Sequence, residues 1–259
     1  MKNLFQVAEN ECVKPGYYRI RLTGTGLETA KPGQFVMVRQ IGQTEPLLRR
    51  PFSIHRFHTG ERNGFEILYQ VKGVFTEMLS ACKPYDLLSV LGPLGNGFSL
   101  KDIPLYIVAG GIGVAPMVFW VEDLIRKGFD LRNVEFFLGA RSEEDLLMND
   151  FLKKLGIKLH LCTDDGSMGQ KGFVTDAFQK RAHEAPPMAV VTCGPEGMLQ
   201  AVAGFCTDWQ IPCEISMEAY MACGIGACLG CAVKSAAHPE KFSHVCQDGP
   251  VFNAKDMIW

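Results

Sequence analysis

LYIVAGGIGVAPM, residues 105–117, joins an apolar run to a glycine-rich turn and then to an apolar, helix-length segment that continues to Lys127. Glycines let the backbone turn sharply and approach a ligand, and the N-terminus of the following helix presents free N–H groups to a pyrophosphate. A proline stands where the third glycine of the G-x-G-x-x-G fingerprint would be, so an ordinary strand-to-helix turn is the alternative. The candidate nucleotide-binding residues here are Gly110, Gly111, Gly113 and Pro116.

Strands and helices are expected to alternate downstream of this turn. VEFFLGA, KLHLCT and MAVVTC are strand-like runs, and helical segments follow them up to about residue 210. This alternation predicts an α/β domain with a parallel sheet. TCGPEGM, residues 192–198, ends the last of these strands, and open α/β sheets bind ligands at the carboxyl ends of their strands. Cys193 is therefore a candidate site residue, with a buried strand-end thiol as the alternative.

The chain upstream of the turn is rich in short β-type runs. QFVMVRQ and GFEILYQV are examples, and Gly, Pro, Asn and Lys separate these runs, which is typical of an antiparallel barrel or sandwich. In RRPFS, Arg50 offers a planar fork of donors suited to a phosphate or an aromatic face, and Ser53 offers a hydroxyl. Thr76, in KGVFTEML, is a candidate for facing an anion at a helix N-terminus, with an ordinary N-cap as the alternative.

Four cysteines near the C-terminus follow the pattern C-x4-C-x2-C-x14-C. Its close triplet matches the plant-type spacing for a [2Fe-2S] cluster, in which four thiolates hold two irons. The glycines in MACGIGACLGC favour this interpretation, because a loop around a cluster must turn tightly and point N–H groups at the sulfurs. Structural zinc is the alternative, although zinc sites usually use two short C-x2-4-C pairs. The candidate ligands are Cys223, Cys228, Cys231 and Cys246.

The composition narrows the possible functions. The formal net charge of −2 gives no basic surplus for nucleic acid. Ten cysteines without a secretory leader favour a reducing, cytoplasmic compartment. Residues 103–121 lack charge over a length that could cross a bilayer, but their internal glycines and prolines favour a strand, a turn and a helix over a membrane span.

Several of these strings, in this order, resemble the ferredoxin-reductase-type flavoproteins. RPFS is followed by a Y-x-V-x-G…T segment, then by GGIGVAP and CGP. The cysteine segment followed by CQDGPVF closely resembles the electron-transfer subunits of NAD-dependent dihydroorotate dehydrogenase B. The resemblance covers essentially the whole chain. It implies an antiparallel FAD-binding barrel at residues 1–100, an α/β NAD-binding domain at 101–210 and a small [2Fe-2S] domain at 211–259.

The resemblance also implies residue roles. NAD would bind at the turn after residue 109 and near Cys193, Gly194 and Pro195, with residues 163–176 shaping its site. Arg141 could hold a 2′-phosphate, whereas Glu143 and Glu144 would repel one, and the resemblance favours NAD over NADP. A Gly-Thr pair is usual in the family where Phe75-Thr76 stands here, so the contact at Phe75 departs from the pattern. The implied FAD-binding residues are Arg50, Pro51, Phe52, Ser53, Leu68, Tyr69, Gln70, Phe75 and Thr76.

The implied cofactors form a relay. NAD accepts a hydride and an iron–sulfur cluster carries single electrons, so a flavin, which does both, must stand between them. The resemblance implies that electrons come from dihydroorotate, oxidised in pyrimidine biosynthesis by an FMN-containing catalytic subunit, in a heterotetramer of two plus two chains. One alternative is the small subunit of a related ferredoxin-dependent transhydrogenase, hydrogenase or sulfide dehydrogenase. Another is a zinc-stabilised module without redox function.

Overall fold

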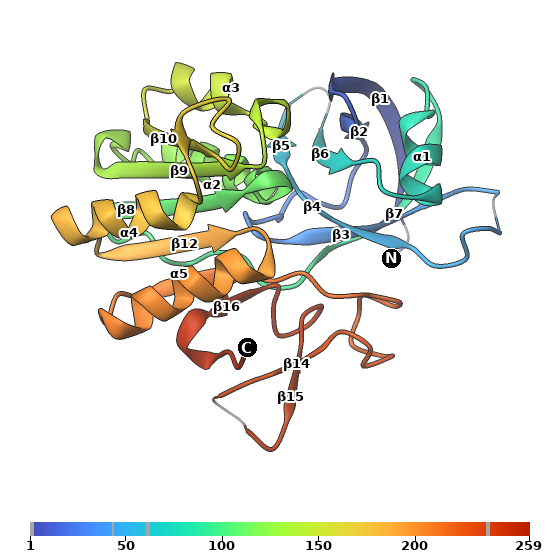
Figure 1. Cartoon of the computed structure of the whole chain (residues 1–259). Helices are drawn as coiled ribbons and strands as arrows, with labels where there is room; N and C mark the ends of the chain where they lie inside the picture. Colours follow the sequence, from blue (N-terminus) through green and yellow to red (C-terminus); the bar gives the residue numbers. More distant parts are fainter. Residues whose placement is uncertain (1–2, 43, 61–62, 237–238) are drawn as a thin grey trace.

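The computed structural model describes residues 3–42, 44–60, 63–236 and 239–259. Figure 1 shows an all-β part at the upper right, an α/β part at the left and a C-terminal segment, in orange and red, beneath both. This arrangement confirms the predicted fold class.

The first part is a seven-stranded antiparallel sheet in the order β4-β3-β7-β1-β2-β6-β5. Only Ile54 and His55 separate its two edge strands, β4 and β5, so the sheet curls until its edges meet and forms the expected barrel. Alternate residues such as Val36 and Val38 point into the interior. The strands are β1 (Asn3–Lys14), β2 (Tyr17–Thr23), β3 (Phe35–Gln40), β4 (Arg50–Ser53), β5 (Arg56–His58), β6 (Gly64–Gln70) and β7 (Leu87–Leu94).

One helix covers the barrel between β6 and β7. This helix, α1 (Val74–Ser80), buries Phe75 and Leu79 against the barrel core. The two apolar side chains lie four residues apart, on one face of the helix.

The second part is a seven-stranded sheet in the order β11-β10-β9-β8-β12-β13-β16. All neighbouring strands pair in parallel except β16, which runs antiparallel to β13. The last two strands of this sheet, β13 and β16, come from the part of the chain that follows residue 211. The strands are β8 (Leu105–Gly110), β9 (Val134–Ala140), β10 (Lys158–Thr163), β11 (Gln170–Lys171), β12 (Ala189–Cys193), β13 (Cys213–Ser216) and β16 (Val251–Asn253).

Helices cover both faces of this sheet. Alternate residues of β8 point to opposite faces, so Ile107 packs against α2 and α3, whereas Tyr106 and Val108 pack against α4 and α5. The strand–helix alternation expected downstream of residue 105 is thus present. The helices are α2 (Val114–Arg126), α3 (Asn149–Lys154), α4 (Val174–Glu184) and α5 (Glu196–Asp208).

The C-terminal segment leaves the second sheet and returns to it. After β13 it runs along the barrel, forms the small hairpin of β14 (Ala232–Lys234) and β15 (Phe242–His244), and re-enters the sheet as β16. A short 3-10 helix, η4 (Ala254–Asp256), then packs against α5 and β13.

Candidate functional site

The two glycine-containing loops meet at the carboxyl edge of the second sheet. Ala109 and Cys193 are partners on the neighbouring strands β8 and β12. A Cβ placed on Gly113 would lie 2.2 Å from the carbonyl oxygen of Cys193, and one on Gly194 would lie 3.0 Å from the Gly110 nitrogen. The close approach that requires these glycines is therefore between the two loops themselves.

Gly111 of the first loop, unlike Gly113, does not lie against the second loop. Gly111 has φ +53°, and a Cβ there would meet no atom within 4 Å, so this backbone faces open space. Pro116 lies buried in the first turn of α2, where its missing N–H removes no helical hydrogen bond. Pro195 occupies the N-cap of α5. The loops thus bring the sequence-predicted residues together around a turn that a nucleotide can approach.

Cys193 lies at the end of β12 and is only 5% exposed. Burial raises the pKa of its thiol to about 12, and the nearby Glu218 carboxylate acts in the same direction. The thiol is therefore neutral at physiological pH, which suits packing or hydrogen bonding beside a ligand and not nucleophilic attack.

Three of the residues predicted to meet FAD come together in the barrel, whereas Leu68 packs into the core beside α2. The ring centroid of Phe52 on β4 lies 6.0 Å from that of Tyr69 on β6 and 6.0 Å from that of Phe75 on α1. Leu68, Tyr69 and Phe75 are buried, whereas Arg50, Pro51, Phe52, Ser53 and Gln70 are partly exposed. The buried residues can contact a ligand chiefly through their backbone, whereas the partly exposed residues can contact it with their side chains.

Two polar residues of this group already have partners in the chain. The Thr76 hydroxyl accepts hydrogen bonds from the N–H groups of Lys72 and Gly73. Gly73 is the N-cap of α1 and Thr76 lies in the first turn, so Thr76 is not the N-cap residue that was the alternative. Arg50 donates to the carbonyl oxygen of Leu48 and has no ion pair within the described ranges. A guanidinium without an ion pair fits an anionic cofactor.

The four C-terminal cysteines are arranged as two pairs. The Sγ atoms of Cys231 and Cys246 lie 3.2 Å apart. The N–H of Cys228 points at the Cys223 Sγ, at 3.4 Å. A [2Fe-2S] cluster takes two protein ligands on each iron, whereas zinc gathers four around one ion. The two pairs of thiols therefore match the two-plus-two ligand set of a [2Fe-2S] cluster.

Backbone N–H groups surround these sulfurs. Cys223 Sγ accepts from Ile225 at 3.4 Å, and Cys246 Sγ accepts from Gly226 at 3.2 Å. Gly224, Gly226 and Leu229 have positive φ, which confirms that the segment turns tightly. Burial raises the pKa of the Cys223 thiol, but the N–H groups of Ile225 and Cys228 outweigh it and bring the pKa down to about 7. The loop thus favours the Cys223 thiolate, whereas burial and the neighbouring Cys231 raise the pKa of Cys246 to about 11.

The CQDGPVF string, residues 246–252, links the three parts of the molecule. Cys246 belongs to the cysteine set. The Asn96 side chain at the end of the barrel donates to the carbonyl oxygen of Asp248, at 2.8 Å, and its N–H donates to Gly249. Val251 then begins β16 in the second sheet. Asn96 was not expected from the sequence, because nothing marks an asparagine in a turn as the partner of a segment about 150 residues away.

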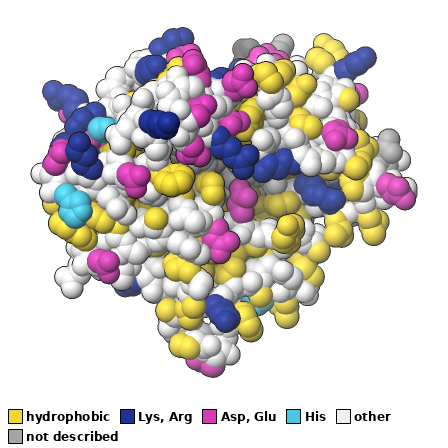
Figure 2. Space-filling view, viewed as in Figure 1, with side chains coloured by type: hydrophobic (Ala, Val, Ile, Leu, Met, Phe, Trp, Pro, Cys, Tyr) yellow, Lys and Arg dark blue, Asp and Glu magenta, His cyan; other side chains and the backbone are white. Residues whose placement is uncertain are grey.

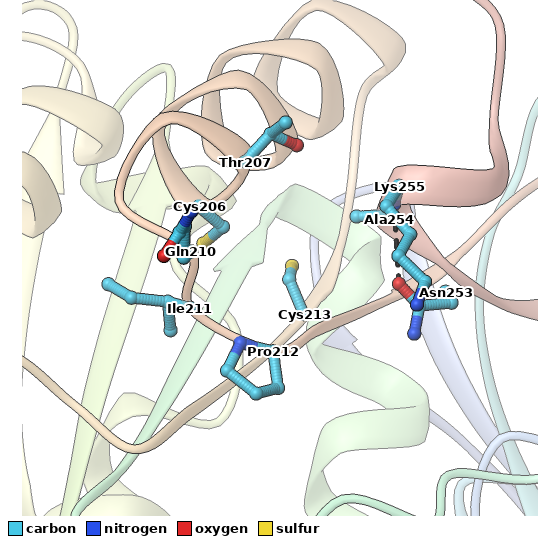
Figure 3. Close-up of a pocket in the computed structure, with 9 residues that line it drawn as sticks. All are labelled: Cys206, Thr207, Gln210, Ile211, Pro212, Cys213, Asn253, Ala254 and Lys255. Atoms are coloured by element: carbon cyan, nitrogen blue, oxygen red, sulfur yellow. Dashed lines mark hydrogen bonds between the residues drawn. The ribbon is translucent and has the colours of Figure 1, made fainter.

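A cavity of about 350 Å³ lies at the opposite edge of the second sheet (Figure 3). It is lined by Cys206 and Thr207 from α5, by Cys213 at the start of β13, and by Lys255 in η4. Because β13 begins where β12 also begins, this cavity lies away from the edge that carries Cys193. It contains none of the predicted site residues. No helix in the described ranges is long and apolar enough to span a bilayer.

Comparisons with known proteins agree with this geometry. Residues 218–258 match the family described as the iron-sulfur cluster binding domain of dihydroorotate dehydrogenase B, and residues 107–204 match the oxidoreductase NAD-binding domain. The dihydroorotate dehydrogenase B (NAD(+)) electron transfer subunit of Clostridium acetobutylicum is 39% identical over 98% of this chain and 96% of that protein. The corresponding subunit of Desulforamulus reducens is 37% identical over 89% of this chain and 87% of that one.

A solved structure extends the similarity to the fold as a whole. The structure of an NADH-dependent reduced ferredoxin-NADP oxidoreductase superimposes with a TM-score of 0.85 at 26% identity, covering 98% of this chain and 90% of that one.

Proposed function

Because this chain belongs to the family of dihydroorotate dehydrogenase B (NAD(+)) electron transfer subunits, we propose that it passes electrons from dihydroorotate oxidation in a catalytic partner subunit to NAD+. Its cofactors are a [2Fe-2S] cluster and FAD. The relatives that carry this name match over nearly the full length of this chain. The similarity to the ferredoxin-NADP oxidoreductase has a lower sequence identity. It gives weaker support to the alternative that this chain is the small subunit of a related ferredoxin-dependent transhydrogenase.

The observation that carries the proposal is the position of the paired cysteines. Cys231 and Cys246 share a small core with Phe35 and Met37 on the outside of the barrel. The same segment completes the second sheet through β16. A cluster held by these cysteines would therefore lie against the barrel that is to hold FAD, and the short separations that electron transfer needs would follow from the packing.

Each part of the chain has a proposed task. We assign FAD binding to residues 1–100, NAD binding to 101–210 and cluster binding to 211–259. The cluster-binding region is joined to the second sheet by β13 and β16. When bound, the flavin exchanges single electrons with the cluster and a hydride with the nicotinamide. Arg50 would neutralise the FAD pyrophosphate, and Phe52 and Ser53 would line the site of its ring system. Cys193, as a neutral thiol, would pack beside the nicotinamide.

The NAD nucleotide would occupy the edge where the two glycine loops meet. The turn at Gly111 leaves backbone accessible, and Glu143 and Glu144 stand exposed after β9. Like charges disfavour a 2′-phosphate, so these carboxylates support NAD over NADP. We further propose that the complex is a cytoplasmic heterotetramer of two of these chains and two FMN-containing catalytic subunits, active in pyrimidine biosynthesis.

Anaerobic purification of the chain together with its cognate catalytic subunit tests the function. The complex should contain FAD and two irons per chain and should reduce NAD+ when dihydroorotate is added. Replacing one ligand, Cys231→Ser, should lower this activity at least 100-fold while FAD is retained, because the path loses its one-electron carrier. A colourless preparation with stoichiometric zinc, or full activity in the variant, would contradict the proposal.

A further inference from the structure

We propose that Arg39 and Arg49, on the outer face of β3 beside the cysteine segment, receive an acidic side chain of the catalytic partner subunit. This inference rests on the proposed function and specifies how the partner is recognised. Arg39 lies at the end of β3, and Arg49 immediately precedes β4.

The alternation of β3 sets the direction of Arg39. Val36 and Val38 belong to the barrel interior, whereas Phe35 and Met37 pack with the cysteine segment on the outside. Side chains two residues apart in a strand point to the same face, so Arg39 stands about 7 Å beyond Met37 on that outer face. A Cβ on Gly224 would lie 2.6 Å from Met37 Cγ, which shows how closely the cysteine segment approaches this row.

Arg49 is fixed on the same face. Its guanidinium donates to the carbonyl oxygen of Ser89 at 2.6 Å and to the Ser89 hydroxyl at 2.8 Å. Ser89 is the partner of Arg39 across β3 and β7. The two arginines therefore flank one serine on a rigid sheet. Burial lowers the pKa of Arg49, and the neighbouring Arg39 charge acts in the same direction.

Neither arginine has a counter-charge among the described residues. The ion pairs found there involve other arginines, including Arg19, Arg56 and Arg181. The Nε of Arg39 is also buried without a hydrogen-bond partner. Holding two partly buried guanidinium groups close together costs free energy, because their charges repel. A carboxylate that pairs with both groups would offset this cost.

The surroundings suit a protein and not a small anion. Exposed apolar side chains occur in the two segments that adjoin this face, namely the loop after β3 and the cysteine segment. In space-filling view, hydrophobic side chains gather at the lower right over these segments, with basic side chains above them (Figure 2). Leu47, Tyr220, Ile225 and Leu229 are each more than half exposed. Cys228 is exposed as well, so a partner that covers the apolar residues would also reach the cluster edge.

The occupant that fits is a surface with an apolar centre and one or two carboxylates. Apolar area provides affinity, and a complementary charge fixes the register and accelerates encounter. A partner that must align a redox centre with the cluster needs such a fixed register.

The test measures binding of purified chain to its cognate catalytic subunit at 50 and 300 mM NaCl. Arg39→Glu should weaken binding roughly 30-fold or more at low salt, and it should flatten the salt dependence. Arg39→Gln, which removes the charge but keeps a polar side chain with N–H donors, should weaken binding less and serves if the reversal fails to fold. Lys180→Glu, an equal charge change on exposed α4, should bind as the wild type does. NADH-dependent ferricyanide reduction by each isolated variant should stay unchanged.

Three results would overturn the inference. Wild-type affinity and salt dependence in both Arg39 variants would remove the arginines from the interface. Equal weakening by Lys180→Glu would mean that general charge attraction, and not this site, steers the partner. If the wild-type chain neither binds the subunit nor supports dihydroorotate-dependent NAD+ reduction, the proposed function fails and the inference falls with it.

Discussion

His55 is a fully buried histidine between the barrel and helix α2. Its Nδ1 lies 2.9 Å from the carbonyl oxygen of Ala115, which can only accept, so this nitrogen carries the proton and donates. Burial, together with the neighbouring Arg56 charge, lowers the pKa of the ring to about 4, although the hydrogen bond to Ala115 acts in the opposite direction. The folded chain therefore keeps this imidazole neutral, whereas the unfolded chain protonates it near its ordinary value of about 6.5.

This difference predicts a loss of stability in mild acid. The contribution of His55 is fully present above about pH 6.5 and declines as the pH falls toward 4, because the unfolded state binds the extra proton over that interval. The expected loss is on the order of 3 kcal/mol. Urea unfolding at pH 7, 5.5 and 4.5 should show this decline in the wild type and a shallower one in His55→Asn, which can still donate to Ala115. Equal declines would contradict the assignment.

At the scale of a single element, the turn between β8 and α2 combines two kinds of glycine. Gly113 has an ordinary helical φ of −60° but no room for a Cβ, whereas Gly111 has room but a φ of +53°. Gly113→Ala should force the two nucleotide loops apart and destabilise the chain by about 1–3 kcal/mol. It should also raise the KM for NADH about 10-fold or more.

Gly111→Ala is the matched comparison. Backbone strain opposes it at about 1–2 kcal/mol, and the loops keep their contact. Its Cβ would enter the open space proposed for the nucleotide, so the KM for NADH should rise although the loop contact is intact. Steady-state kinetics with ferricyanide, alongside thermal unfolding of both variants, measures the two effects. An unchanged KM in Gly111→Ala would remove the nucleotide from this turn, and an unchanged KM in Gly113→Ala would show that the contact between the loops does not shape the nucleotide site.

The sequence predicts such elements well where the pattern is local. The alternation in QFVMVRQ and the order of strand, glycine turn and helix in residues 105–117 yield β3, β8 and α2 without knowledge of the rest of the chain. It predicts long-range pairing poorly. CEIS and VFN are too short to indicate β13 and β16. β13 forms along the edge that β12 offers, and β16 along the edge that β13 offers in turn. The cysteine spacing indicates a metal cluster. The packing of the cysteine segment against Phe35 and Met37, however, depends on the tertiary structure.

At the scale of the whole molecule, the segment after residue 211 is part of the scaffold as well as the holder of the cluster. Ile215 on β13 is fully buried, and the Glu214 carboxylate accepts from the N–H groups of Ser99 and Leu100, at 2.9 and 3.1 Å. Those two residues lie on the connection between the barrel and the second sheet. Glu214 thus fixes the connection to a strand that follows it by more than one hundred residues.

This dependence predicts that the FAD-binding and NAD-binding regions, residues 1–210, do not fold properly without residues 211–259. A chain cut after residue 210 loses β13 and β16, uncovers β12 as an edge and loses the hydrogen bonds from Ser99 and Leu100 to the charged Glu214 carboxylate, worth about 1.5–3 kcal/mol each. We expect this fragment to aggregate or to unfold at much lower urea concentration than the full chain. The full-length Cys231→Ser variant is the control, because it loses a cluster ligand but no strand, and it should stay soluble with one cooperative transition. A soluble 1–210 fragment that binds FAD and NADH as the full chain does would show that the cluster segment is a separable addition.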